Sequence, residues 1–211
     1  MSIYKDVTIL IVTFVPNLRL LKEKIALYKK FKLIIVDTSP DYYKVINGID
    51  LDNNVEVIKI DNNGQGFANN VGIKSAKTKY VLYVDLDADI DLKKIHVLYK
   101  IAIEKDSWSI LIPNSNYKSI VNKNFIQIDN CEASIFFINR KIVIRDDMFD
   151  EQIFFYFEEY DYFSRLNQTN FKVYLLPNLH VSHNQGSSVD KTLVKNVSNI
   201  QQWHYLWSMY Y

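Results

Sequence analysis

The stretch KYVLYVDLDADIDLKK, residues 79–94, decides the fold of this chain. Its apolar and aromatic run, 80–84, predicts a strand over 79–85 that is buried on both faces, as in a parallel sheet covered by helices. Carboxylates then follow at every second position, at Asp85, Asp87, Asp89 and Asp91. Like charges at this density repel each other, so a cation or water must compensate them. Because ligands of an open parallel sheet collect at the carboxyl ends of its strands, the stretch predicts an α/β fold with a ligand site after residue 84.

The first half of the chain repeats this alternation of strand and helix. Apolar runs predict further buried strands at 7–14, 32–40 and 55–61, and helices are predicted at 17–31, within 62–77 after a Gly/Asn loop, and at 91–105. This order predicts a mostly parallel sheet flanked by helices. After residue 105 the pattern is looser, with strands predicted at 107–115, 131–143 and 171–176. We therefore expect a single domain over 1–211, with functional halves at 1–105 and 106–211.

The composition argues against several classes of protein. The 211 residues carry a formal net charge of +1, so no strong electrostatic field points to nucleic acid. The single cysteine, Cys131, excludes an internal disulfide and fits a reducing compartment. No apolar run reaches the roughly 18 residues that a membrane helix needs, and the N-terminal run is predicted to be a buried strand rather than a signal peptide. These features predict a cytoplasmic globular protein that does not bind nucleic acid.

Three kinds of site could use the carboxylate run. An EF-hand calcium loop does not fit, because it needs Gly at its sixth position and Glu at its twelfth, where Ile90 and His96 stand. A phosphatase of the haloacid dehalogenase type and a metal site for a nucleotide diphosphate both place D-x-D after a buried strand. Alternate side chains of an extended segment share a side, which favours Asp85 and Asp87 as the functional pair. The two later aspartates are predicted to be solvated or to cap the next helix.

Aspartates also end two other predicted strands, at Asp37 and Asp61, and a glycine-rich loop follows the second of them. This loop contains Gly64 and Gly66, but the third glycine position of a dinucleotide fingerprint is occupied by Asn69. A Walker pattern with Gly-Lys-Ser/Thr is absent from the sequence. Neither a nicotinamide-dependent dehydrogenase nor a P-loop enzyme is therefore supported.

The second half of the chain adds carboxylates and histidines. Glu158, Glu159 and Asp161 lie within YFEEYDYFSR, and on a helix Glu158 and Asp161 share a face while Glu159 points elsewhere. Such acids either favour a helix N-terminus or act as a general base for a sugar hydroxyl. His180 and His183 precede a Gly-Ser-Ser turn. Two aspartates and a histidine would form a ligand set that suits Mg²⁺ or Mn²⁺.

The order of these motifs resembles that of the family 2 glycosyltransferases, which have the GT-A fold, and especially their bacterial rhamnosyltransferase-like branch that builds surface polysaccharides. The resemblance covers nearly all 211 residues. It rests on six segments in the family's order: ILIVTFVPNLRLL, LIIVDTSP, NNGQGFANNVGI, YVLYVDLDADI, CEASIFFINRKIVIRDDMFDEQIFFYFEEYDYFSRL and LPNLHVSHNQGSS. Val15, Thr38 and Glu159 depart from the family pattern, which usually has Asn at the first two positions and Asp at the third.

The resemblance implies a role for each matching residue. Those that would hold the nucleotide sugar are Thr13, Asp37, Asn63, Gly64, Asn70, Asp85 and Asp87. Asp87 and His183 would bind Mg²⁺ or Mn²⁺. Glu159 would be the general base that deprotonates the acceptor, and Glu158 and Asp161 would support it or contact the acceptor.

The implied reaction is an inverting, metal-dependent transfer of a sugar from a UDP- or dTDP-sugar to a hydroxyl of a glycan or lipid-linked acceptor. Arg165 would orient the acidic cluster or reach the diphosphate. The aromatic C-terminal end predicts either an interface between copies of the chain or a peripheral contact with the inner face of the plasma membrane. Two alternatives stay open: a catalytically inactive nucleotide-sugar or carbohydrate-binding module, which the substitution at position 159 favours, and a D-x-D phosphatase.

Overall fold

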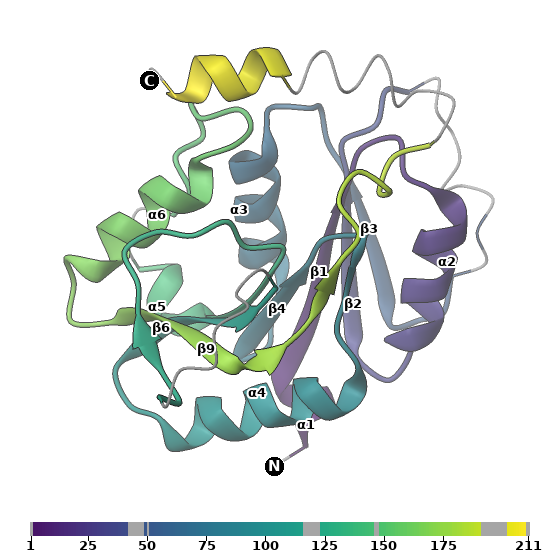
Figure 1. Ribbon diagram of the computed structural model, residues 1–211. Helices are drawn as coiled ribbons and strands as arrows, with labels where there is room; N and C mark the ends of the chain where they lie inside the picture. The colour runs from purple at the N-terminus through teal and green to yellow at the C-terminus, as the bar shows by residue number, and fades with distance from the viewer. Residues whose placement is uncertain are drawn as a thin grey trace.

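The computed structural model describes residues 2–41, 49, 51–115, 123–145, 148–190 and 202–209 (Figure 1). Their strands are β1 (Val7–Thr13), β2 (Lys32–Asp37), β3 (Val55–Lys59), β4 (Tyr80–Val84), β5 (Ala88–Asp89), β6 (Trp108–Asn114), β7 (Ile126–Gln127), β8 (Ile135–Asn139), β9 (Lys172–His180) and β10 (Ser182–His183). Their helices are α1 (Ile3–Asp6), α2 (Leu18–Leu27), α3 (Gln65–Ser75), α4 (Leu92–Glu104), α5 (Arg140–Val143) and α6 (Glu158–Asn167), and a further helix spans 202–209.

The described strands form an eight-stranded sheet in the order β3-β2-β1-β4-β8-β6-β9-β7. The first four run parallel, with β1 paired to both β2 and β4. All residues of β4 are buried, and β1 and β2 are buried over nearly their whole length. Strands covered on both faces need apolar residues at every position, which is why their sequences read as continuous runs. The predicted α/β architecture with a mostly parallel sheet is confirmed.

The second half of the chain extends the same sheet beyond β4. Strand β8 runs antiparallel between β4 and β6, and β9 runs parallel to β6. The strand predicted at 131–143 is shorter in the structure, because the chain turns into α5 at Arg140. The Arg140 side chain fixes this turn by donating from Nε to the carbonyl of Ile73 at 2.9 Å. The short helix α1 was not predicted, and β9 extends past its predicted end at residue 176.

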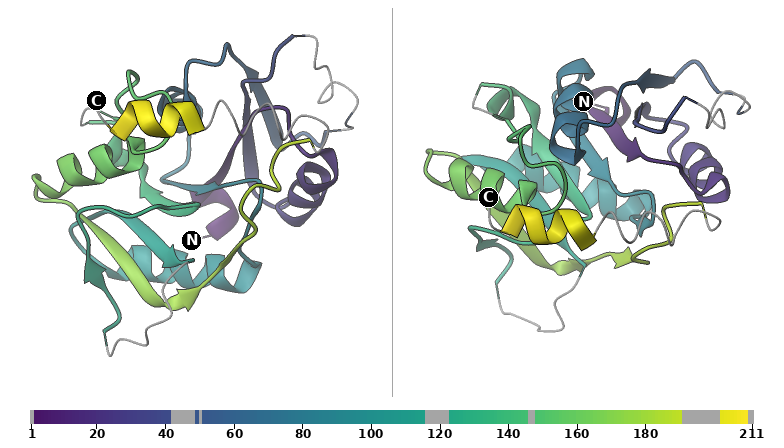
Figure 2. Two further views of the ribbon diagram at one scale, coloured as in Figure 1. Left: turned by 45° about the horizontal axis from the view of Figure 1, so that its top comes forward. Right: turned by 90° about the horizontal axis from the view of Figure 1, so that it is seen from above.

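Helices cover both faces of the sheet (Figure 2). On one face, α2 and α4 bury side chains such as Leu21 and Leu98. On the other face, α3, α5 and α6 bury Ile73, Val143 and Phe163. Each such side chain contributes about 1.5–3 kcal/mol when it is fully withdrawn from water. This packing makes the sheet a rigid support for the loops at its carboxyl edge.

A small sheet of β5 and β10 lies after β4, with His183 opposite Ala88 in an antiparallel pair. The buried Lys24 of α2 donates to the carbonyl of Ala88 and, at 2.5 Å, to the carboxylate of Asp89. Asp89 therefore has a lysine partner that the sequence did not predict. It does not cap the next helix, because it lies in β5, before α4 begins. Asp91 is the N-cap of α4, as predicted, and accepts a hydrogen bond from the first turn.

At the C-terminal end the structure describes the helix over 202–209. The membrane or subunit contact predicted for the aromatic end, 199–211, falls partly on 199–201 and 210–211, outside the described residues. This helix exposes large apolar side chains: Trp203 is 59% exposed, Leu206 56% and Trp207 54%. Among the described helices, none combines the length and the apolar character needed to cross a membrane.

Candidate functional site

A cavity of about 730 Å³ opens at the carboxyl edge of the sheet, beside the ends of β1 and β4 and the start of α6. The predicted site residues that line it are Thr13, Gly64, Asp85, Asp87, Glu158, Glu159 and His183. The other predicted residues are described but are not among the lining residues: Asp37, Asn63, Asn70 and Asp161. The cavity thus brings together residues from both halves of the chain.

Asp85, Asp87 and His183 meet at one place on the cavity wall. The Nε2 atom of His183 lies 3.2 Å from Oδ1 of Asp87 and 3.9 Å from Oδ2 of Asp85. Each of these described residues offers one ligand atom, and the three atoms lie within 4.8 Å of one another. Carboxylate oxygens suit Mg²⁺ and Mn²⁺, and imidazole is compatible with Mn²⁺. The donor set therefore fits a divalent cation.

The pairing of β5 with β10 fixes these ligands relative to one another. The amide of Asn184 donates to the backbone carbonyl of Asp87 at 2.9 Å. The amide of Ser187 donates to the Asp87 carboxylate at 3.1 Å. Asp87 is buried. Its Oδ1 atom contacts His183, and its Oδ2 atom accepts from the loop that follows β10.

The two aspartates differ in their affinity for a proton. Burial, together with the charge of Asp87, raises the pKa of Asp85 to about 7, although Tyr83 and His183 oppose this rise. Burial also acts on Asp87, but hydrogen bonding from His183 outweighs it and lowers the Asp87 pKa. Asp87 in turn raises the pKa of His183. The carboxyl groups of Asp85 and Asp87 thus lie close together where water is partly excluded, and a bound cation would compensate their negative charge.

Two residues that the sequence did not identify orient Asp85. The hydroxyl of Tyr83 donates to the Asp85 carboxylate, and Nε2 of Gln65 donates to the Tyr83 oxygen at 2.7 Å. Tyr83 stands two positions before Asp85 and hence on the same side of the extended chain, a spacing that could have revealed it. Gln65 carries no comparable signal, because it is one polar residue in a polar stretch of the sequence.

Glu158 and Glu159 begin α6 and also line the cavity. Glu158 is buried and Glu159 is half-buried, and Oε2 of each is shielded from solvent without a hydrogen-bond partner among the described residues. Burial raises the pKa of Glu159 to about 7 and that of Glu158 well above its ordinary value. We expected Glu159 to point away from Glu158, but both line the cavity. Side chains of a first turn lean back toward the helix N-terminus, which here faces the cavity.

Asp161 and Arg165 form an ion pair one turn further along α6. The Nη2 atom of Arg165 lies 2.6 Å from Oδ2 of Asp161 and also donates to the Met148 carbonyl at 2.8 Å. About a third of each side chain is exposed, so the pair contributes less than about 1 kcal/mol. Arg165 thus joins α6 to the chain that precedes it, and Asp161 stands apart from the two glutamates in the cavity wall.

Thr13 and Asp37 lie side by side at the ends of β1 and β2. The Thr13 hydroxyl donates to Asp37 Oδ1 at 3.1 Å, and Lys59 Nζ donates to Asp37 Oδ2 at 3.0 Å. Thr13 lines the cavity and Asp37 does not. The buried Asp37 carboxylate therefore orients Thr13 and Lys59.

Asn63 precedes α3 and Asn70 lies within it, and neither residue lines the cavity. The amide of Asn63 donates to the Asp61 carbonyl at 3.0 Å. The side chain of Asn70 donates to the carbonyl of Phe149 at 2.9 Å and accepts from its amide at 3.1 Å, which joins α3 to the second half of the chain. The neighbouring Asn69 lines the cavity instead, and its Oδ1 has no partner among the described residues.

Replacing Gly64 with alanine is expected to lower the free energy of unfolding by about 1–3 kcal/mol. Gly64 has a φ of +102°, and a Cβ there would lie 2.5 Å from the Phe154 carbonyl oxygen. Gly186→Ala is the matched control, because its φ is +81° but its Cβ would meet nothing within 4 Å. Urea unfolding measures both variants. An equal loss in the two would show that the contact with Phe154 adds nothing to the backbone strain.

The metal-free protein is expected to lose stability as the pH rises from 4.5 to about 7. The unfolded chain has ordinary glutamates with a pKa of 4.5, whereas Glu158 and Glu159 keep their protons to higher pH when folded. Their stabilisation is fully present below the unfolded pKa and is lost as the pH passes the folded pKa. The acidic and titratable groups that act on the pair are Asp85, Glu132, Tyr83, Tyr156 and Cys131.

Urea unfolding with a chelator, repeated across this pH range, measures the effect. The double variant Glu158→Gln, Glu159→Gln should show a flatter dependence on pH than the wild type, because glutamine does not titrate. Asp161→Asn is the matched control on the same helix and should keep the wild-type slope. If the double variant also kept that slope, the two buried carboxyls would not be its source.

The sequence model of the family described as Glycosyl transferase family 2 matches residues 17–165 of this chain. No curated protein matches the sequence. The match includes the D-x-D segment and both glutamates of the cavity, and it ends at Arg165.

Solved structures of similar fold include the following three. TarS from S. aureus has a TM-score of 0.61 and 16% identity, over 86% of this chain and 37% of its own. GalNAc-T7, solved with UDP, GalNAc and Mn²⁺, has a TM-score of 0.65 and 14% identity, over 85% of this chain and 44% of its own. The mannosyltransferase PcManGT from Pyrobaculum calidifontis, solved with GDP-Man and Mn²⁺, has a TM-score of 0.65 and 14% identity, over 97% of this chain and 64% of its own. This chain thus spans between about a third and two thirds of each of these proteins.

Proposed function

This chain belongs to glycosyltransferase family 2 and has the GT-A fold, and from that premise we propose that it transfers a sugar from a nucleotide diphosphate sugar to an acceptor hydroxyl. One observation carries the proposal. A set of potential metal ligands and the glutamates Glu158 and Glu159 line the same cavity, and sugar transfer needs both a diphosphate site and a base.

Asp85, Asp87 and His183 would hold Mg²⁺ or Mn²⁺, a choice supported by their donor atoms and by the Mn²⁺ in two structures of similar fold. When bound, such a cation supplies positive charge that stabilises the diphosphate leaving group. Tyr83 and Gln65 keep Asp85 oriented toward the site through their chain of hydrogen bonds. Asp87 is kept in place by the amide of the loop after β10.

Glu159 is the proposed general base. It accepts the proton of the acceptor hydroxyl while the acceptor oxygen bonds to the anomeric carbon and the bond from that carbon to the diphosphate breaks. Attack from the face opposite the leaving group inverts the configuration. A pKa of about 7 suits this role, because a base is most effective when its pKa lies near the working pH. Burial raises the pKa of the neighbouring Glu158 well above its ordinary value and so favours its protonated form, which could donate a hydrogen bond to the acceptor.

The nucleotide would lie along the first half of the chain, 1–105, between Thr13 and Gly64. Both residues line the cavity, and Asp37 supports Thr13 from the next strand. Asn63 and Asn70 would act by shaping the loop and α3 rather than by contact. We propose UDP- or dTDP-sugars as donors; the structures of similar fold were solved with UDP and with GDP-Man.

The second half, 106–211, would bind the acceptor, a glycan or a lipid-linked sugar, with Asp161 and Arg165 supporting the start of α6. The resemblance to the rhamnosyltransferase-like branch supports a role in bacterial surface polysaccharide synthesis at the cytoplasmic face of the membrane. The exposed apolar side of the helix over 202–209, with Trp203 and Trp207, would mediate peripheral membrane contact or pairing of two copies.

A panel of nucleotide sugars tests the proposal. Each donor is incubated with the protein, Mn²⁺ or Mg²⁺ and a mixture of glycan acceptors, and release of the nucleoside diphosphate is measured by chromatography. We expect one donor to be consumed in a cation-dependent manner, with inverted configuration in the product. Binding of donors without turnover under any acceptor would instead indicate a binding module. Release of phosphate from simple esters would indicate a phosphatase.

A further inference from the structure

The aromatic segment, residues 154–157, leads into the two glutamates with an unusual backbone conformation. Tyr156 and Phe157 have φ angles of +64° and +68°, in the left-handed region that bulky side chains rarely adopt. Phe157 is the N-cap of α6, and its side chain forms no capping hydrogen bond. Because Glu158 and Glu159 follow at once, the direction in which their side chains leave the backbone depends on these two residues. Such a conformation persists only where surrounding contacts hold it.

Contacts from two sides hold the aromatic segment. On one side, the amide of Gln65 at the start of α3 donates to the Phe154 carbonyl at 2.7 Å. On the other side, the hydroxyl of Ser208 in the helix over 202–209 donates to the Phe155 carbonyl at 2.8 Å. The ring of His204 from the same helix stacks on Phe154, with centroids 4.1 Å apart and planes 19° apart. The C-terminal helix is therefore docked on this segment.

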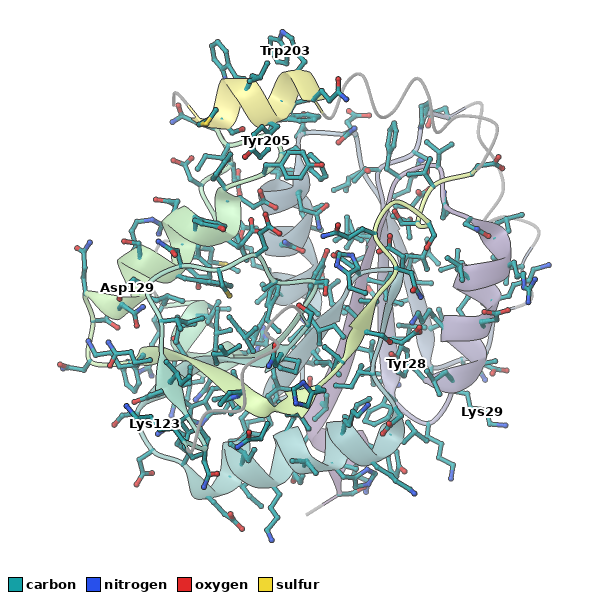
Figure 3. The ribbon with its side chains drawn as sticks, viewed as in Figure 1. Tyr28, Lys29, Lys123, Asp129, Trp203 and Tyr205 are labelled. Atoms are coloured by element: carbon teal, nitrogen blue, oxygen red, sulfur yellow. The ribbon has the colours of Figure 1, made fainter. Side chains whose placement is uncertain are left out.

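Tyr205 contacts the two left-handed residues themselves. Its ring centroid lies 5.5 Å from that of Tyr156 and 5.3 Å from that of Phe157. Figure 3 shows Tyr205 on the side of the helix that faces the rest of the molecule and Trp203 on the side that faces away. One ring thus fills the space against both side chains, so neither can turn to an ordinary φ without losing this packing.

We propose that Tyr205 is a positioning residue: by packing on Tyr156 and Phe157 it holds the left-handed turn that aims Glu158 and Glu159 into the cavity. The proposal rests on the function proposed above, in which Glu159 is the base. Without the ring, the turn can relax to ordinary backbone angles, which rotates the first turn of α6 and moves both carboxylates. A displacement of about 1 Å can cost on the order of 10²-fold in rate. Tyr205 contacts both residues of the turn through its ring, so phenylalanine should serve as well as tyrosine.

The kinetic test compares Tyr205→Ala with Tyr205→Phe and uses Leu206→Ala as the matched control. Leu206 is on the same helix and is 56% exposed, so its truncation removes mainly solvent-exposed apolar surface and leaves the Tyr205 ring in place. In Tyr205→Ala we expect kcat to fall roughly 10- to 100-fold at an unchanged Kd for the donor. The acidic limb of the kcat/KM profile should also move to lower pH as water reaches the glutamates. Tyr205→Phe and Leu206→Ala should keep the wild-type values.

A second measurement does not depend on turnover. The pH dependence of urea unfolding in metal-free protein reports the protonation of Glu158 and Glu159, and Tyr205→Ala should flatten it while Tyr205→Phe and Leu206→Ala do not. If Tyr205→Ala matched Leu206→Ala in both measurements, the positioning role would be overturned. A wild-type protein that transfers no sugar, but whose pH dependence responds to Tyr205→Ala as expected, would retain the positioning role of Tyr205 and overturn the proposed reaction instead.

Discussion

Replacing Glu159 with glutamine is expected to lower kcat by about 10²- to 10⁴-fold, which is the usual contribution of a positioned base. Glutamine keeps the shape of the side chain and its place at the start of α6, but it cannot accept the proton of the acceptor hydroxyl. The fold and the affinity for the donor should therefore stay unchanged. Steady-state kinetics with saturating donor and acceptor measure kcat, and isothermal titration measures the donor Kd.

Glu158→Gln is the matched comparison, since it alters the neighbouring carboxyl in the same cavity wall. Burial raises the pKa of Glu158 well above its ordinary value, and glutamine can donate a hydrogen bond as a protonated carboxyl does, so we expect a loss below about 10-fold. The opposite ranking, with the larger loss in Glu158→Gln, would assign the base to Glu158. Near-normal turnover in both variants would exclude the pair and leave Asp161 to be tested.

Replacing Asp87 with alanine is expected to weaken Mn²⁺ binding by at least about 10²-fold and to remove cation-dependent transfer. Loss of a residue that merely supports a metal ligand already costs about 10- to 100-fold in affinity, and Asp87 is a proposed ligand itself. Its buried carboxylate lies 3.2 Å from His183, so alanine also releases the histidine. Titration calorimetry with Mn²⁺ and the cation dependence of kcat measure the two effects.

Asp91→Ala is the control for this change, because it removes another carboxylate from the same run of aspartates. Asp91 caps α4, so its loss should cost about 1 kcal/mol of stability while Mn²⁺ affinity is unchanged. Equal Mn²⁺ affinity in Asp87→Ala and in the wild type would place the cation elsewhere. Equal weakening in both variants would mean that the net charge of the run, rather than a defined ligand, attracts the cation.

The parallel half of the sheet could be predicted from the sequence because burial on both faces leaves a local signal. The apolar runs at 7–14, 32–40 and 79–85 correspond to β1, β2 and β4 within a few residues. The position of β8 between β4 and β6 could not be predicted, since it depends on pairing between distant segments. Strands β5 and β10 have two residues each, too few to show any alternation, although they bring His183 beside the aspartates.

The candidate site was predictable to a similar extent. The spacing of Asp85 and Asp87 and the pair Glu158–Glu159 could be recognised in the sequence, and all four line the cavity. The partners that other helices and strands supply to these residues could not be recognised in the sequence. Lys24, the partner of Asp89, lies 65 positions earlier in the chain. Such a pairing depends on how helices dock onto the sheet, which no local pattern encodes.

The bond from the Ser187 amide to the Asp87 carboxylate joins residues that are 100 positions apart in the chain. Contacts of such long sequence separation require the closure of a large loop, and they slow folding because the entropic cost comes before the gain. During synthesis, the four parallel strands are complete well before β10 leaves the ribosome. The three-residue ligand set is therefore complete only once β10 has paired with β5, so the first uptake of Mn²⁺ would report that this long-range pairing has formed.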